Sequence, residues 1–396
     1  MTKSKKSVFR KWIAASNVQF VEVLKKNNLF FLLAAMILIA IGICWVSSTT
    51  QIVLPNSKGD LFQFSGFKIF KQIVALILGL AAMYCISILD FEKTIKKFSI
   101  AWIVYGITIL LLMITLLMPA RDGGRRWIPL YIFNLQTAEF AKIVILFFVA
   151  SYMGDRRRMA DVQQNSFKVF YPFVLAGIGL FFIALEPDIG IPALTFAAIC
   201  CMMFVSGVSI GNLIRVLLMS IPVFVFDCYR NFGHRLGRIQ SYVLSTFSDQ
   251  KVDVLGDAYQ VSKSLIGICS GGITGQGFAH SYQKTHLLSQ HDSDFVFSVF
   301  AEETGLIGSL LLMSLYGVLI YQCYKIALNT RDSYYRSLAV GFTVILGTQA
   351  FYSIAVNANF APIKGIALPF ISYGGSSLIS TLIIIGIMMN IAAHQD

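Results

Sequence analysis

The chain has 396 residues, of which 56% are hydrophobic and only 13% are charged, and its mean hydropathy is +0.71. This composition is typical of an integral membrane protein and argues against a soluble domain. The formal net charge of +12 leaves two interpretations open, anchoring to anionic lipid or binding of an anionic ligand. The seven cysteines have no CxxC spacing, so we expect packing residues and not a disulfide framework.

The hydrophobic runs predict an all-α polytopic membrane protein. A membrane-spanning helix needs about 20 mostly apolar residues. A basic tail, residues 1–28, precedes the first run, which is too long for a cleavable signal peptide. We expect a single membrane domain over residues 29–396, with a long outer loop at 229–293 between the seventh and eighth helices. The predicted spans are residues 29–48, 70–89, 98–118, 138–153, 169–185, 189–207, 211–228, 295–325, 335–358 and 371–393.

The basic residues set the predicted orientation. With both termini in the cytoplasm, the tail and the short loops on that side hold more than half of the 32 Lys and Arg residues, as the positive-inside rule requires. Several basic residues fall on the outer side, where the rule does not favour them. For the tail we favour contact with anionic lipid, and for the outer face we favour an anionic ligand.

The segment 121–142, RDGGRRWIPLYIFNLQTAEFAK, precedes the fourth predicted helix on the outer side. Glu139 and Lys142 lie three residues apart and therefore share one helix face. One interpretation is an interfacial loop with a structural ion pair. The other is that Arg126 and Lys142 donate hydrogen bonds to a phosphate. The short turn EPDIG, residues 186–190, is ordinary turn chemistry, although Asp188 could pair with a basic neighbour.

Residues 259–284 predict a half-buried helix followed by a glycine-rich loop. Val261, Leu265 and Ile268 have helical spacing, which indicates a helix lying against the bundle. The loop glycines at 271, 272, 275 and 277 could leave backbone amides free for an anion, close to Lys284.

The stretch LLSQHDSDFVFSVFAEE, residues 287–303, places acids at the start of the eighth helix. Asp294 could simply be the N-cap of that helix. Glu302 and Glu303 lie deeper in the helix and must face a polar interior or a basic partner. Farther on, prolines and glycines interrupt residues 357–378, and broken segments of this kind commonly line substrate sites.

The order of these motifs resembles the SEDS family of cell-wall polymerases. The resemblance covers most of the chain and rests on RRW, QTAE with Lys142, PDIG, GGITGQG, DSDFVFSVFAEETGLIG and PIKGIALPFISYGGSSL. SYQK at 281–284 and PIKG at 362–365 are more similar to the division branch, FtsW, than to the elongation branch, RodA. QTAE replaces the family's QPSE, and LSQHDSDF replaces a pattern closer to LPExHTDF.

The resemblance implies a ten-helix glycosyltransferase that polymerises lipid II at the outer face of the bacterial cytoplasmic membrane, at the division site, and releases undecaprenyl diphosphate. It implies that Asp294 is the essential acid. A base must take a proton from the attacking sugar hydroxyl, and cations must stabilise the leaving diphosphate. We expect Arg126, Lys142, Lys284 and Lys364 to form that clamp, and we place Glu139, Glu302 and Ser376 in the substrate-binding set.

Three other functions stay open at this point, a lipid II transporter, an elongation-type (RodA) polymerase and a non-enzymatic scaffold for division proteins. A transporter should carry polar residues through the bilayer midplane. Here the centres of most predicted spans are apolar, and the charges that the topology rule does not explain concentrate on the outer side. A scaffold leaves the outer carboxylates unexplained. The resemblance implies a class B penicillin-binding transpeptidase as a partner, together with other division proteins and membrane lipid but no nucleic acid. No ligand cluster for Mg²⁺ or Mn²⁺ is visible, so a divalent cation is a prediction that only the substrate chemistry supports.

Overall fold

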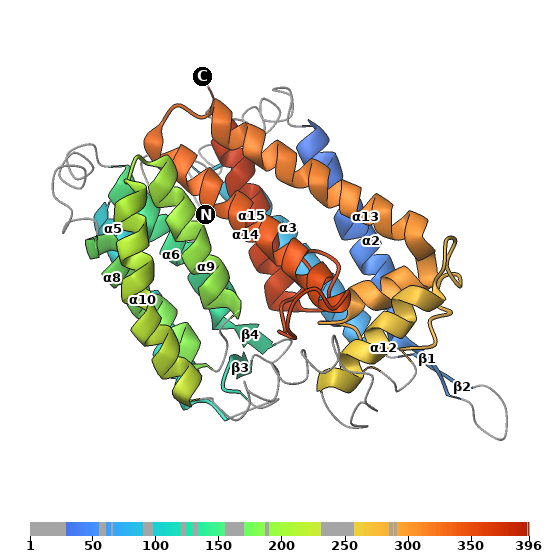
Figure 1. Cartoon of the computed structure of the whole chain (residues 1–396). Coiled ribbons are helices and arrows are strands. Elements are labelled where there is room, and N and C mark those ends of the chain that lie inside the picture. The colour runs from blue at the N-terminus through green and yellow to red at the C-terminus, as the bar shows by residue number, and fades with distance from the viewer. Residues whose placement is uncertain are drawn as a thin grey trace, which may run out of the picture.

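The computed structural model is a bundle of helices with two short hairpins at one end (Figure 1). It describes residues 29–54, 61–64, 66–89, 98–119, 124–129, 134–154, 170–186, 190–230, 257–284, 288, 291–393 and 395. The basic tail lies outside the described residues, as do residues 231–256 of the outer loop 229–293, Asp188 and Arg121.

Each of the ten predicted spans coincides with a helix in the described part of the chain. These helices are α2 (Leu29–Thr50), α3 (Gly66–Ser87), α5 (Phe98–Leu117), α6 (Thr137–Met153), α8 (Phe170–Leu185), α9 (Gly190–Val205), α10 (Ile210–Arg230), α13 (Val296–Asn329), α14 (Ser333–Asn357) and α15 (Gly375–Ala393). Six of them are long and apolar enough to cross a membrane, and α8, α9 and part of α10 are shorter apolar helices. The predicted all-α polytopic fold is therefore confirmed.

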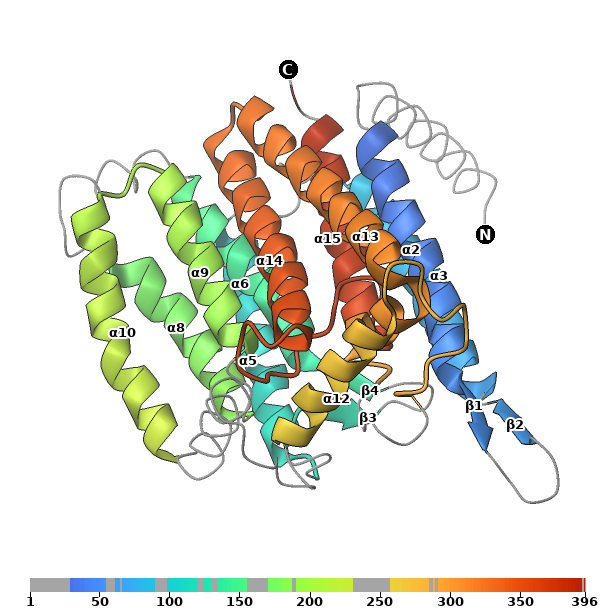
Figure 2. The same ribbon diagram turned by 45° about the vertical axis from the view of Figure 1, so that its right-hand side comes forward.

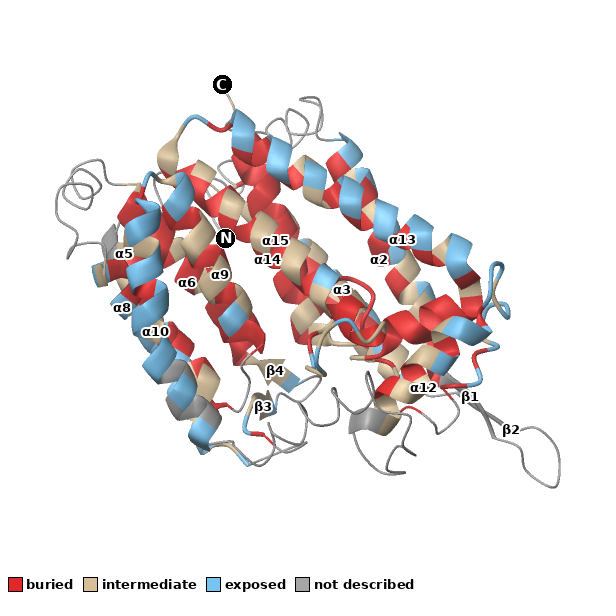
Figure 3. Cartoon of the chain, viewed as in Figure 1, coloured by how far each residue is buried: buried red, intermediate tan, exposed pale blue. Residues whose placement is uncertain are grey.

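The core of the bundle is built around α15, α14 and α6, which are largely buried (Figure 3). Helix α15 packs most extensively against α3, and glycines allow the close approach. A Cβ at Gly386 would stand 2.6 Å from the carbonyl oxygen of Met83, and a Cβ at Gly79 would stand 2.4 Å from Leu382 Cδ1. Small residues at such crossings are typical of membrane helices, where van der Waals packing drives association.

One end of the bundle carries the non-spanning elements (Figures 1 and 2). They are the hairpin β1 (Gln51–Leu54) with β2 (Leu61–Phe64), the hairpin β3 (Trp127–Pro129) with β4 (Asn134–Gln136), and α12 (Asp257–Ser270). The predicted half-buried helix is thus confirmed, with Val261 buried and Ile266 exposed. We call this end the outer end, because the distribution of Lys and Arg in the sequence predicts that it faces away from the cytoplasm.

Helix α13 is broken near its outer end. Its 34 residues would span about 51 Å, well beyond the bilayer core of about 30 Å. Gly305 has φ 67° and ψ −164°, which ends the first helical segment and starts a second. The glycine-rich loop fills the break, because the amides of Gln276 and Gly277 donate to the carbonyls of Glu302 and Glu303 at 2.9 and 3.0 Å.

Candidate functional site

Asp294 is not the N-cap residue of α13. The N-cap position is Phe295, whose side chain makes no cap hydrogen bond. The N-cap interpretation of Asp294 was therefore wrong. The turn is instead held by the segment before α15, because Tyr373 N donates to Asp292 O at 2.8 Å and Ser372 Oγ donates to Ser293 O at 2.6 Å.

Asp294 lies against the loop that carries Lys364. A Cβ built at Gly365 would stand 2.8 Å from Asp294 Oδ2, so the carboxylate rests on bare backbone next to that lysine. Both Asp294 and Lys364 are partly exposed. The aliphatic stem of Lys364 in turn passes the start of α9, where a Cβ at Gly190 would stand 3.2 Å from its Cε atom. The structure thus brings the predicted acid and one predicted cation to the same outer surface.

Arg126 is anchored at the outer end of α8. Its Nε atom donates to the carbonyl of Glu186 at 3.0 Å, and the Glu186 carboxylate accepts a hydrogen bond from Thr137 Oγ1 at 3.1 Å. Glu186 is fully buried, whereas Arg126 is partly exposed. Arg126 thus binds at the end of α8, and the stem of Lys364 lies at the start of α9.

Glu139 and Lys142 form a buried ion pair at the start of α6. Their side-chain atoms Oε2 and Nζ are 2.6 Å apart, and Lys142 is 2% exposed. Ser380 Oγ donates to the same carboxylate oxygen at 2.7 Å, and Lys142 Nζ donates to Gln349 Oε1 at 3.3 Å. A structural ion pair was one of the two interpretations of segment 121–142, and the structure shows this pair. Lys142 therefore lies inside the protein.

Lys284 is also buried, at 2% exposure, and its ammonium group is surrounded by acceptors. It donates to Glu303 Oε1 at 3.2 Å, to Ala279 O at 2.6 Å and to Ser48 O at 3.2 Å. Ser48 Oγ donates to both oxygens of Glu303, at 2.6 and 2.8 Å. The expectation that Glu303 faces a polar interior or a basic partner is confirmed. The same geometry gives Lys284 a structural partner and leaves its contact with a diphosphate unsupported.

Glu302 holds the outer loop in place. It accepts hydrogen bonds from Ser281 Oγ, from Tyr282 N at 3.1 Å and from Gln283 N at 3.3 Å. Ser270 Oγ reaches it at 3.3 Å. A carboxylate with four donors and 1% exposure serves as a fixed anchor for the loop in this conformation.

The glycine-rich loop does not form an anion nest. The amides of the four glycines donate to carbonyls of the protein itself, including Gly275 N to Gly271 O at 2.8 Å. A Cβ at Gly275 would stand 2.2 Å from the carbonyl oxygen of Glu303, which shows how tightly the loop enters the break in α13. The prediction of free amides was wrong, because Gly277 N donates to the broken helix and the other three glycine amides donate to carbonyls of α12 and of the loop itself.

Ser376 ties the second hairpin to α15. Its hydroxyl accepts from Gln136 N and donates to Asn134 O, both at 3.0 Å, and the residue is 2% exposed. The hydroxyl therefore fixes β4 where that strand enters α6. This arrangement argues against a direct contact of Ser376 with substrate, because the hydroxyl is already used by β4.

Sequence reasoning missed Lys68 on the first turn of α3. Its Nζ atom lies 2.6 Å from Asp292 Oδ2 and 5.7 Å from the centre of the Tyr373 ring. The side chain of Lys68 remains 42% exposed. Burial, and secondarily the charge of Asp292, raise the pKa of the Tyr373 phenol above its usual value of 10.0, so the phenol stays protonated. A basic residue at the outer end of a span, against the topology rule, was the only signal for Lys68.

The partly exposed cations Lys68, Lys364 and Arg126 form what we call the outer cation row. Lys68 pairs with Asp292, Asp294 lies against the Lys364 loop, and that loop lies against Gly190 at the start of α9. Arg126 binds the carbonyl of Glu186, directly after α8. Cations beside a positioned carboxylate can bind an anionic leaving group while the acid handles a proton. In the described part of the chain, no three His, Cys, Asp or Glu side chains gather as a metal site.

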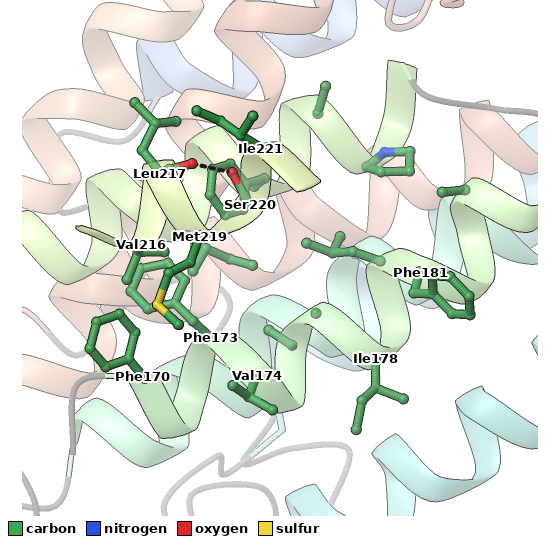
Figure 4. Close-up of a pocket in the computed structure, with 18 residues that line it drawn as sticks. Phe170, Phe173, Val174, Ile178, Phe181, Val216, Leu217, Met219, Ser220 and Ile221 are labelled. Carbon is green, nitrogen blue, oxygen red and sulfur yellow. Dashed lines mark hydrogen bonds between the residues drawn. The ribbon is translucent and has the colours of Figure 1, made fainter. Parts of the chain in front are cut away.

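A separate apolar groove lies between α8, α9 and α10, with a volume of about 760 Å³ (Figure 4). Phe173, Phe181 and Met219 are among its lining residues. The hydroxyl of Ser220 is turned back to the carbonyl of Leu217 at 2.7 Å. None of the predicted site residues lines this groove, and its chemistry suits hydrocarbon only.

The fold and the site together define a polytopic membrane protein with a cation-flanked carboxylate at its outer surface. The Cell cycle protein family model that covers FtsW, RodA and SpoVE matches residues 27–396. The chain therefore belongs to this family, as the motif order predicted.

Individual relatives agree with this assignment. The chain is 31% identical over 364 residues to a probable peptidoglycan glycosyltransferase FtsW of Marinomonas mediterranea, covering 90% of this chain and 86% of the relative. It is 28% identical to stage V sporulation protein E of Bacillus subtilis, covering 93% and 97%. Among solved structures, a chain of a peptidoglycan synthase complex matches with a TM-score of 0.72 at 24% identity, covering 92% and 98%. The rod shape determining protein RodA of Thermus thermophilus matches with a TM-score of 0.62 at 24% identity, covering 92% and 97%.

Proposed function

We propose that the chain is a peptidoglycan glycosyltransferase that polymerises lipid II at the outer membrane surface, in septal wall synthesis. The observation that carries the proposal is the placement of Asp294, a partly exposed carboxylate resting on Gly365 beside Lys364. The names of relatives such as FtsW of Geobacter metallireducens, 31% identical over 375 residues, support the activity.

In the proposed reaction, a sugar hydroxyl of one lipid II molecule attacks the anomeric carbon of another. Asp294 accepts the hydroxyl proton as the new C–O bond forms, and the bond to the diphosphate breaks with its electron pair remaining on the leaving oxygen. The outer cation row stabilises the growing negative charge of that diphosphate. The buried residues of the predicted site have a structural role, since they fix the helices and loops that carry the row. These residues are Glu139, Lys142, Lys284, Glu302 and Ser376.

A transporter is the less favoured candidate. Within the described spans, every charged residue lies in the two turns nearest an end, except Glu302 and Glu303, which precede the break at Gly305. A translocation pathway calls for polar groups at the midplane. The charge distribution therefore favours chemistry at the surface.

We propose that a divalent cation binds only when the substrate is bound. Mg²⁺ is commonly held by one or two carboxylates plus substrate phosphates, and Asp294 with a diphosphate would provide such a set. The partner we propose is a class B penicillin-binding transpeptidase, which the likeness to a chain of a peptidoglycan synthase complex supports.

The test is incubation of the purified protein in liposomes with fluorescent lipid II, with and without the partner transpeptidase. We expect glycan strands and released undecaprenyl diphosphate. A protein that moves lipid II between leaflets and forms no strands, even with its partner, would contradict the proposal and favour the transporter.

A further inference from the structure

The amino terminus of α13 receives its cap from a different helix. Backbone amides in a first helical turn need an outside acceptor, and the Phe295 side chain cannot provide one. Asn357, the last residue of α14, supplies it, because its Oδ1 atom accepts from Ser298 N at 3.0 Å. The carbonyl of Phe295 shares that amide at 3.2 Å.

The same side chain also holds the backbone of the proposed catalytic acid. Asn357 Nδ2 donates to Asp294 O at 2.9 Å and to Ser353 O at 2.8 Å. The side chain is fully buried, so each of its contacts replaces water. Two carbonyls face the nitrogen and one amide faces the oxygen, which leaves a single orientation of the amide group.

Asn357 also stands where three parts of the site meet. Helix α14 ends at this residue, and the loop that carries Lys364 and Gly365 begins directly after it. Ser264 Oγ of α12 donates to Asn357 O at 2.8 Å. A shift of this one residue would therefore move the acid relative to the lysine loop.

We propose that Asn357 is a positioning residue that sets the place of Asp294 against the Lys364 loop. This inference rests on the proposed function, because it gives Asn357 a role through Asp294 and no contact with substrate. Misplacing a reacting group by about 1 Å can cost about 100-fold in rate. Asn357 would thus affect turnover far more than substrate binding.

Asn390 provides a matched control at the other end of the bundle. It is also fully buried, and its Nδ2 atom donates to the carbonyls of Ile86, Ser87 and Leu89 at 3.1, 3.1 and 2.7 Å. Its loss should destabilise the fold in a comparable way without touching the acidic turn.

The experiment compares Asn357→Asp, Asn357→Ser and Asn390→Asp in liposomes with labelled lipid II. In Asn357→Asp the new carboxylate still accepts from Ser298 N, but an oxygen now faces the carbonyls of Asp294 and Ser353. We expect kcat to fall about 100-fold with KM changed by less than about threefold. Asn357→Ser has a single hydroxyl, which can donate only one hydrogen bond, so its kcat should lie between those of Asn357→Asp and the parent protein. Asn390→Asp should lower the unfolding temperature and keep the turnover of each folded molecule.

The inference is overturned if Asn357→Asp keeps kcat within about threefold of the parent protein, or if its loss only follows the amount of folded protein, as for Asn390→Asp. Should Asn357→Asp not fold, Asn357→Ser decides by the same criteria. Asp294→Asn is measured beside them. If that variant is fully active, the proposed function fails, whereas an inactive Asp294→Asn with active Asn357 variants removes only the positioning role.

Discussion

The carboxylate of Asp294 rests on the bare Cα of Gly365, where a Cβ would stand 2.8 Å from Oδ2. Contacts that short are not tolerated, so any side chain at 365 must displace the acid or the loop. The relationship joins the proposed base to the loop of the proposed cation Lys364.

Gly365→Ala should therefore slow polymerisation by about 100-fold while leaving substrate affinity nearly unchanged. Steady-state kinetics with labelled lipid II measure both quantities. Gly374→Ala is the matched control in the same segment, because its new Cβ would meet only Ser377 Cβ, at an ordinary 3.7 Å. Equal activity of the two variants would show that the Asp294–Gly365 contact does not set the rate.

The Lys68–Asp292 pair should matter more for activity than for stability. The Lys68 side chain is 42% exposed, so water screens the pair and its loss should cost at most about 1 kcal/mol of unfolding free energy. Lys68→Met removes one member of the outer cation row and should raise KM for lipid II, most clearly at low salt. Unchanged KM at low ionic strength would exclude Lys68 from diphosphate binding.

The buried Lys284–Glu303 pair should behave in the opposite way. Breaking a buried ion pair leaves an uncompensated charge and costs about 3–5 kcal/mol, so Lys284→Met should lower the unfolding temperature sharply. Glu303→Gln in the same chain should recover part of the loss, since no charge is then left alone. Lys263→Met is the control, because Lys263 is only partly buried and lies 5.3 Å from the Tyr259 ring centre. A Lys284→Met variant with normal stability but raised KM would restore the diphosphate-clamp role of that lysine.

Divalent cation binding should require the lipid diphosphate. One carboxylate alone is a weak site, whereas a carboxylate with phosphate oxygens is a set that Mg²⁺ and Mn²⁺ use. We expect the paramagnetic signal of Mn²⁺ to show binding to the parent protein when undecaprenyl diphosphate is present. We expect no such binding to Asp294→Asn. Equal Mn²⁺ binding by the parent protein and that variant would show that Asp294 does not ligate the metal.

The sequence could predict what is local. The spans follow from hydrophobic runs, the Glu139–Lys142 pair follows from its three-residue spacing, and α12 follows from its apolar face. Long-range partners could not be predicted, because no spacing rule links Lys68 to Asp292 across the chain. The prediction of an anion nest in the glycine loop failed for a related reason. Its amides donate to α12, to the loop itself and to the helix break at Gly305, which hydropathy does not reveal.

The most direct measurement is single-turnover polymerisation of labelled lipid II by Asp294→Asn in liposomes. The amide keeps the size of the side chain but cannot accept the hydroxyl proton. We expect insertion and unfolding temperature close to those of the parent protein, normal lipid II binding, and no glycan strands. Strand formation at the parent rate would contradict the assignment of Asp294 as the base.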